Sequence, residues 1–259
     1  YLQSHYMAAI KQVALKLKDL PNVIGFDSLN EPSTGYIGKS NLDTTGIIKT
    51  GATPSLKEGM FLAAGISRQV AVFSGGLLAQ VEDSVLLNPQ GVSAWKEGYE
   101  PVWRQHGVWK VNDAGEPELL QPNYFTEVNG RQVDFPNHYL KPFLKRFADT
   151  IRSVHPELVV FAEPALFSQL PDMEPGQARK FVNASHWYDA ITLFTKTHNP
   201  VLSFDIATSK PLVGKKNIAE AFARQLGQVK HETEEAFGAA PTLVGEFGIP
   251  FDMDEKEAF

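Results

Sequence analysis

The chain has 259 residues and a formal net charge of −6, with 43% hydrophobic and 21% charged residues. This balance is typical of a globular protein that buries a core, and the lack of a basic cluster argues against nucleic acid as the main partner. The absence of cysteine excludes a disulfide framework and a cysteine-based zinc site. The sequence contains no run of about 18 apolar residues, so it predicts no membrane span. No signal-peptide pattern follows Tyr1, and the localisation stays open.

An amphipathic helix is predicted over residues 2–20, where apolar residues recur at spacings of three and four. Residues 23–29 then form a short apolar run, as expected for a parallel strand covered on both faces. This run stops abruptly at Asn30-Glu31-Pro32. A helix followed by a short loop and a buried strand predicts an α/β architecture.

Residues 33–136 lack a sustained alternation of strands and helices and are punctuated by glycine and proline. A helix is predicted at about 55–64 and a short strand at 69–73. A stretch of this length inside a compact domain is usually functional, so we interpret it as a long insertion that forms a lid or wall over the site next to Glu31. It holds three of the four tryptophans, which are expected to build its own small core rather than an exposed glycolipid-binding wall: Trp95, Trp103 and Trp109.

Regular alternation returns after residue 137. The pattern predicts a helix at 138–154, a strand at 158–162, a strand at 181–189, a helix from 218 to about 238 and a strand at 241–246. Four predicted strands thus end in charged or hydrogen-bonding residues, which is typical of a (β/α)8 barrel. A doubly wound sheet also places its site at strand ends, but it usually offers a glycine-rich phosphate turn, and none is present here.

Three motifs occur in order along the chain: Leu29-Asn30-Glu31-Pro32, His186-Trp187-Tyr188 and Gly245-Glu246-Phe247-Gly248. This ordered set resembles glycoside hydrolase family 5, a family of retaining (β/α)8 glycosidases. The resemblance implies that Glu31 ends the fourth barrel strand and is the acid/base, and that Glu246 ends the seventh strand and is the nucleophile. It also implies that Asn30 binds the sugar 2-hydroxyl, and that His186 and Tyr188 orient the carboxylates.

On this resemblance, residues 1–259 form an incomplete α/β TIM barrel with strands four to seven present and residues 33–136 inserted after the strand that bears Glu31. The arginine, histidine and tryptophan that the family takes from strands two, three and eight cannot be assigned. The chain is therefore expected to be a fragment, which alone is inactive or aggregates because its sheet edges are uncovered. Residues 30–38 look most similar to the branch of endoglycoceramidases, glucosylceramidases and steryl β-glucosidases.

Retaining hydrolysis of a glycoside needs two carboxyl groups about 5–5.5 Å apart and no metal or organic cofactor. The expected partner is therefore a carbohydrate or glycolipid. Glu163 follows the second predicted strand and is expected to be a hydrogen-bond partner in the substrate site rather than a catalyst, and Trp187 is either a sugar platform or a core residue. Two alternatives stay open: a β-glucan or mannan endo-hydrolase of the same family, and an inactive carbohydrate-binding relic. The sugar, the aglycone, exo or endo cleavage and the oligomeric state are not readable.

Overall fold

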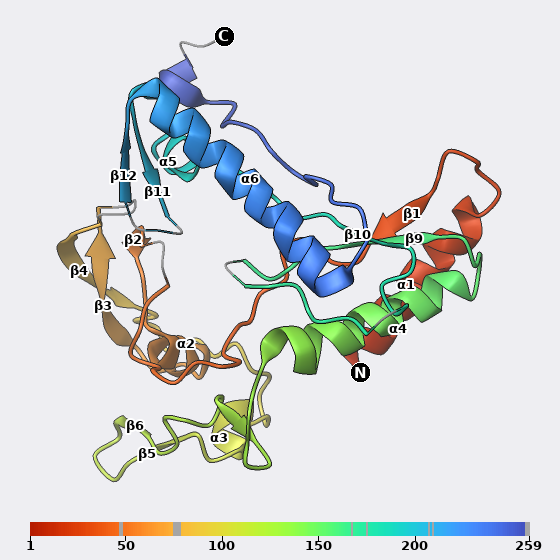
Figure 1. Cartoon of the computed structure of the whole chain (residues 1–259). Coiled ribbons are helices and arrows are strands. Elements are labelled where there is room, and N and C mark those ends of the chain that lie inside the picture. Colours follow the sequence, from red (N-terminus) through yellow and green to blue (C-terminus); the bar gives the residue numbers. More distant parts are fainter. Residues whose placement is uncertain are drawn as a thin grey trace. The chain divides into compact units, whose positions relative to one another are not determined.

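The computed structural model describes residues 1–46, 49–74, 79–166, 168–174, 176–206, 208 and 210–256. The chain divides into two compact units (Figure 1). Unit 1 joins residues 1–34 to residues 134–259, and unit 2 comprises residues 35–133. Within the described part of the chain, every helix is too short or too polar to cross a bilayer.

Unit 1 contains the strands and helices that carry the predicted motifs. They are α1 (Leu2–Leu17), β1 (Gly25–Asp27), a π-helical turn (Pro136–Leu140), α4 (Lys141–Arg152), β9 (Val159–Ala162), β10 (Phe181–Asn183), α5 (Ala190–Thr195), β11 (Leu202–Asp205), β12 (Lys210–Val213), α6 (Lys215–Phe237) and a 3-10 turn (Met253–Lys256). The predicted α/β class is confirmed. The predicted helices are present as α1, α4 and α6, and α6 ends at Phe237 with Gly238 as its C-cap residue, close to the expected end.

A parallel sheet in the order β1-β9-β10 forms the centre of unit 1. Val160 in the middle strand pairs with Phe26 on one side and Phe181 on the other. The described residues form this open three-stranded sheet and no closed barrel, so the (β/α)8 barrel stays a prediction. The strand predicted at 23–29 is also shorter than expected, and β1 has only half-buried and exposed residues.

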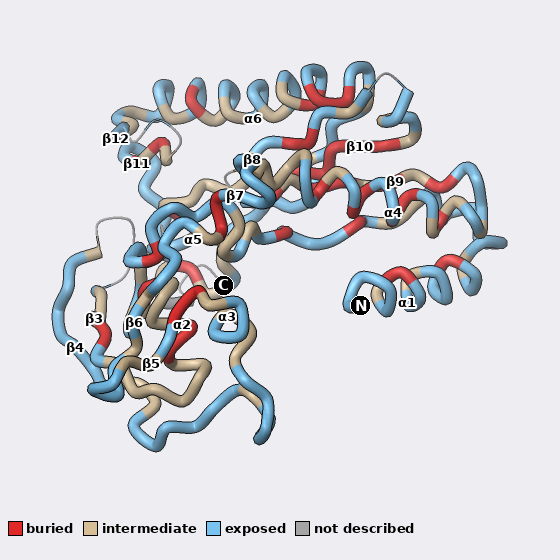
Figure 2. Tube along the Cα trace, turned by 90° about the horizontal axis from the view of Figure 1, so that it is seen from below, coloured by how far each residue is buried: buried red, intermediate tan, exposed pale blue. Residues whose placement is uncertain are grey.

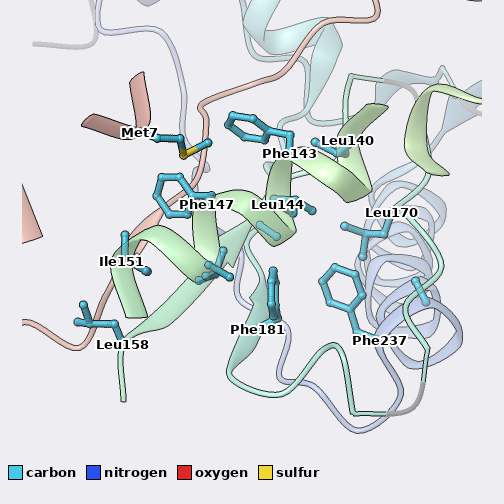
Figure 3. Packing of buried hydrophobic residues seen from close by; sticks show 14 of the residues in the cluster. Met7, Leu140, Phe143, Leu144, Phe147, Ile151, Leu158, Leu170, Phe181 and Phe237 are labelled. Carbon is cyan, nitrogen blue, oxygen red and sulfur yellow. The ribbon is translucent and has the colours of Figure 1, made fainter. Parts of the chain in front are cut away.

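The hydrophobic core of unit 1 lies on one face of this sheet. Val160 and Ala162 are fully buried against α1, α4 and α6, and alternation along the strand turns their neighbours to the other face. Figure 3 shows how Phe147 and Leu144 of α4 pack in this cluster, and Figure 2 shows that buried residues recur along α4. Helices thus cover one face of the sheet, and because its strands are parallel their carboxyl ends lie at the same edge.

The prediction of a regular strand at 241–246 is wrong. Only Thr242 makes a β-bridge, in parallel to Asn183. The Ser185 N–H donates to the Asn183 side chain at 3.0 Å instead of to this segment, which breaks the ladder. The neighbouring backbone bonds persist, since Leu243 N–H donates to the Asn183 carbonyl at 2.7 Å and Gly245 N–H to the Ser185 carbonyl at 3.0 Å. The segment therefore lies beside β10 as an irregular parallel edge.

Unit 2 is built from one three-stranded antiparallel sheet and two antiparallel strand pairs. Its elements are β2 (Gly51–Ala52), α2 (Leu56–Ala63), β3 (Arg68–Phe73), β4 (Val81–Leu87), α3 (Val102–Gln105), β5 (Trp109–Val111), β6 (Pro117–Leu119), β7 (Glu127–Val128) and β8 (Arg131–Gln132). The sheet has the order β2-β3-β4, and the pairs are β5-β6 and β7-β8. The predicted helix at 55–64 and strand at 69–73 are present as α2 and β3. Trp109 is buried beside Phe61, and Trp103 packs against the same cluster. The expectation that these two tryptophans build a local core is confirmed.

Candidate active site

Five predicted site residues lie together in unit 1, beyond the carboxyl ends of the parallel strands. Glu31 follows β1, Glu163 follows β9 directly, and His186 and Tyr188 follow β10. Glu246 comes from the irregular segment that lies along β10. Parallel strands present their carboxyl ends at the same edge of a sheet, so residues far apart in the sequence meet there.

Glu31 has an unusual backbone. Its φ angle is +41°, in the left-handed region that costs a non-glycine residue roughly 1–2 kcal/mol. The Glu31 N–H donates a hydrogen bond of 2.8 Å to Oε2 of Glu163, across 132 positions of sequence. The next residue, Pro32, is buried. The contact to Glu163 and the buried proline hold the loop in a shape that leaves the carboxylate of Glu31 free to reach its neighbours.

His186 lies between three carboxylates. Its Nδ1 is 2.9 Å from Oε1 of Glu31 and 3.4 Å from Oε2 of Glu246, and its Nε2 is 3.2 Å from Oε1 of Glu163. The side chain is 10% exposed. Burial alone lowers the pKa of His186, but the hydrogen bond to Glu31 and the charges of the three carboxylates outweigh it and raise the pKa. The imidazole therefore carries its positive charge to higher pH than a free histidine.

Glu246 is held from two sides. The Trp187 N–H donates to the Glu246 carbonyl at 2.9 Å, which fixes the backbone. The Tyr188 hydroxyl donates to Oε2 of the carboxylate at 2.9 Å. This hydrogen bond is the main cause of a raised pKa of Tyr188, and partial burial is the second cause. The phenol therefore stays protonated and remains a donor. A donor on its oxygen stabilises the ionised form of a carboxylate.

Glu163 is the most buried carboxylate of the group, with a side chain that is 4% exposed. Burial raises its pKa from the ordinary value of 4.5 to about 7, and a hydrogen bond and charge from Asp27 add to the rise. The backbone hydrogen bond from Glu31 acts in the opposite direction and does not cancel it. Asp27, the last residue of β1, was not among the predicted site residues. The sequence signal that could have identified Asp27 as a site residue was its position near the end of a predicted strand, close to Glu31.

Asn30 and Trp187 have different surroundings. Asn30 is exposed next to Glu31. The indole of Trp187 packs edge-to-face against Phe222 of α6, with ring centroids 5.0 Å apart, and its Nε1 donates to Gln225 at 3.1 Å. These contacts give Trp187 a packing role against α6, and the substrate-binding roles of both residues stay predictions.

The two carboxylates that the motifs single out face each other across His186. One oxygen of Glu31, one oxygen of Glu246 and a ring nitrogen of His186 all lie within 4.8 Å of one another. Both glutamates are exposed to solvent, whereas Glu163 and His186 below them are not. This arrangement offers two accessible carboxyl groups that are held by hydrogen bonds to the residues around them.

Comparison with known proteins points to glycoside hydrolases, although no family model matches the chain. The curated relatives include a glucosylceramidase of Rhizopus delemar, 30% identical over the whole chain and 40% of that protein. An ergosteryl-beta-glucosidase of Saccharomyces cerevisiae is 27% identical over 97% of the chain and 38% of that protein. The chain thus spans about two fifths of the length of the relatives that it matches.

A solved structure agrees with the sequence matches. The crystal structure of Cryptococcus neoformans sterylglucosidase 1 superposes with a TM-score of 0.89 at 27% identity, over 99% of this chain and 41% of that one. Over nearly its whole length, the chain is therefore similar in sequence and in fold to part of glucosidases that are named for glucosylated lipids.

Proposed function

We propose that this chain provides the catalytic carboxylates of a retaining β-glycosidase that hydrolyses a glucosylated lipid. One observation carries the proposal: oxygens of Glu31 and Glu246 lie within 4.8 Å of each other. Retaining glycosidases hold their carboxyl groups about 5–5.5 Å apart, whereas inverting enzymes leave about 6.5–9.5 Å for a water molecule. The short spacing supports a double displacement.

In this mechanism Glu31 is the acid/base and Glu246 the nucleophile. The Glu246 carboxylate attacks the anomeric carbon while Glu31 gives its proton to the leaving glycosidic oxygen, so one C–O bond forms as another breaks. Glu31 then removes a proton from water, which attacks the same carbon and releases Glu246. The Tyr188 hydroxyl donates a hydrogen bond to the Glu246 carboxylate, and His186 orients both glutamate side chains. Neither step needs a metal or an organic cofactor.

The names of the relatives support the proposed substrate class. They are named for glucosylceramide and ergosteryl β-glucoside, both of which join glucose to a lipid alcohol. Glycoside hydrolase family 5 is the family that the motifs resemble, with Asn30 beside the acid/base to bind the sugar. We also propose that residues 33–136 form an insertion in a partial barrel of residues 1–259, and that this insertion selects the lipid part of the substrate.

The test of the two carboxylates uses the full-length protein. Glu31→Gln and Glu246→Gln are each expected to lower kcat by about 10²–10⁴-fold, because each removes an acid, base or nucleophile. Azide is expected to rescue Glu246→Ala and to give the α-glucosyl azide, the opposite anomer. The control is Glu157→Gln, an exposed glutamate paired with Lys180 on the surface. Near-normal turnover of either Gln variant would contradict the assignment.

A substrate panel tests the lipid preference. Glucosylceramide, a steryl β-glucoside, an oligosaccharyl ceramide and soluble cellulose would be compared by kcat/KM, with product anomers followed by NMR at early times. We expect the two glucosylated lipids to be preferred and the β-anomer of glucose to appear first. Preference for cellulose would favour the endo-hydrolase alternative, and initial release of the α-anomer would exclude retention.

A further inference from the structure

Glu163 has no step in the reaction described above, yet it is the most enclosed carboxylate of the site. We infer that Glu163, supported by Asp27, is a positioning residue that holds the backbone of Glu31 and the ring of His186 so that the acid/base faces Glu246. The inference rests on the proposed function, because it assigns a role within the same site.

Both oxygens of Glu163 are used, and they hold different parts of the site. Oε2 accepts the N–H of Glu31 at 2.8 Å, and Oε1 lies 3.2 Å from Nε2 of His186. The other nitrogen of that ring contacts Oε1 of Glu31 at 2.9 Å. Glu163 thus fixes Glu31 twice, directly through its backbone and indirectly through the imidazole that contacts its side chain.

The backbone of Glu31 needs such a support. Its φ angle of +41° is one that side-chain-bearing residues rarely adopt. A hydrogen bond from its N–H to a buried carboxyl group selects this conformation over the extended alternatives. Because the conformation sets the direction of the Glu31 side chain, the contact to Glu163 sets where the acid/base lies.

Asp27 contacts the carboxyl group of Glu163 and so contributes to its position. Its carboxyl group hydrogen-bonds to that of Glu163, and this contact adds to the rise in the pKa of Glu163. The ionisable groups that face Glu163 are Asp27 from β1, Glu31 from the following loop and His186 after β10. In either protonation state an oxygen of Glu163 can accept the Glu31 N–H, whereas the attraction to His186 requires the charge.

The experiment compares Glu163→Ala and Glu163→Gln with wild type in the full-length protein. Glu163→Ala loses the acceptor for the Glu31 N–H and is expected to lower kcat by about 100-fold with little change in KM, since a catalytic group displaced by about 1 Å costs this much. Glu163→Gln keeps an oxygen for that N–H and is expected to recover most of the loss. The control is again Glu157→Gln, an exposed glutamate that precedes β9, whereas Glu163 follows the other end of that strand.

A second readout is independent of turnover. NMR titration of ¹³C-labelled histidine gives the midpoint of His186, which Glu163→Gln is expected to move to lower pH because the variant removes a negative charge 3.2 Å from the ring. The acid limb of the pH–rate profile should move with it. An unshifted midpoint together with wild-type kcat in both Glu163 variants would overturn the inference. A shifted midpoint in a protein that cleaves no β-glucoside would support the positioning contacts and reject the proposed function.

Discussion

At the scale of single residues, the site is organised by one imidazole among acids. His186 contacts Glu31, Glu163 and Glu246 with its two ring nitrogens. Three carboxylates this close would repel one another, and the charged ring compensates for much of that repulsion. The carboxylates of Glu31 and Glu246 can therefore lie near each other around the charged ring.

Tyr188 offers the simplest test at this scale. Tyr188→Phe removes the hydroxyl that donates to Glu246 at 2.9 Å and leaves the ring in place. A hydrogen bond to a charged group contributes about 1.5–3 kcal/mol, so kcat should fall roughly 10- to 150-fold. Steady-state kinetics on a β-glucoside measure this, with circular dichroism to show that the fold is kept. An unchanged kcat would mean that Tyr188 does not stabilise the nucleophile.

At the scale of elements, the segment that carries Glu246 is held by close backbone approach rather than by a regular strand. A Cβ on Gly245 would lie 2.4 Å from the carbonyl oxygen of Ala184. No side chain fits there without moving the segment away from β10. The glycine before Glu246 is thus required by packing, since it lets the nucleophile lie against the sheet edge.

A matched pair of glycine substitutions tests this. Gly245→Ala should lower kcat by about 100-fold through displacement of Glu246, whereas Gly248→Ala, which meets nothing within 4 Å, should leave folding and turnover nearly unchanged. Both variants would be compared by kcat and by thermal unfolding. Equal activity of the two alanine variants would show that the close approach at Gly245 does not position the nucleophile.

The elements also show what the sequence could and could not predict. The periodicity of α1, α4 and α6 was sufficient for their placement, because amphipathic helices repeat over many residues. The hairpin of β11 and β12 was missed, since these strands are short and mix polar with apolar residues. The motifs located Glu31, His186 and Glu246, but no local pattern shows that the Asn183 side chain takes the N–H of Ser185 and so interrupts the last strand.

Asp27 was missed for a related reason. It ends a strand as a single acid, and its significance depends on the buried Glu163 that lies next to it in space. Tertiary proximity of this kind leaves no trace in the spacing of residues along one chain. The prediction of a hydrogen-bonding role for Glu163 agrees with its contacts, whereas the direct contact with substrate is untested.

At the scale of the whole molecule, the buried carboxyl group links stability to pH. Because the pKa of Glu163 is about 7 when folded and near 4.5 when unfolded, the folded state binds more protons between these values. Its contribution to the free energy of unfolding is present below pH 4.5 and is lost as the pH rises through 7. Each unit of pKa difference corresponds to about 1.4 kcal/mol.

Urea unfolding at several pH values measures this linkage. The wild type should lose a few kcal/mol relative to Glu163→Gln between about pH 4.5 and 7.5, since the glutamine does not titrate. The two proteins share every other ionisable group, so the difference reports the titration of Glu163 together with its coupling to His186. A constant difference across this range would show that the carboxyl group does not titrate there.

The uncovered surface of unit 1 leads to a further expectation. β1 is an edge of the parallel sheet, and Ile24 just before it is 63% exposed. Unpaired strand edges with apolar neighbours promote association. The 259-residue chain expressed alone should therefore bind a hydrophobic dye, self-associate in light scattering and fail to cleave β-glucosides. A monodisperse and active chain would contradict this expectation.

The distribution of tryptophan has a practical consequence. Trp95, Trp103 and Trp109 belong to unit 2, and Trp187 is the sole tryptophan of unit 1. Since its indole rests on Phe222 and bonds to Gln225, its emission reports whether α6 is docked beside the residues that hold Glu246. With phenylalanine at the other three tryptophan positions of these 259 residues, Trp187 would be their remaining indole, and its emission would report without an attached label on the packing of α6 one residue from His186.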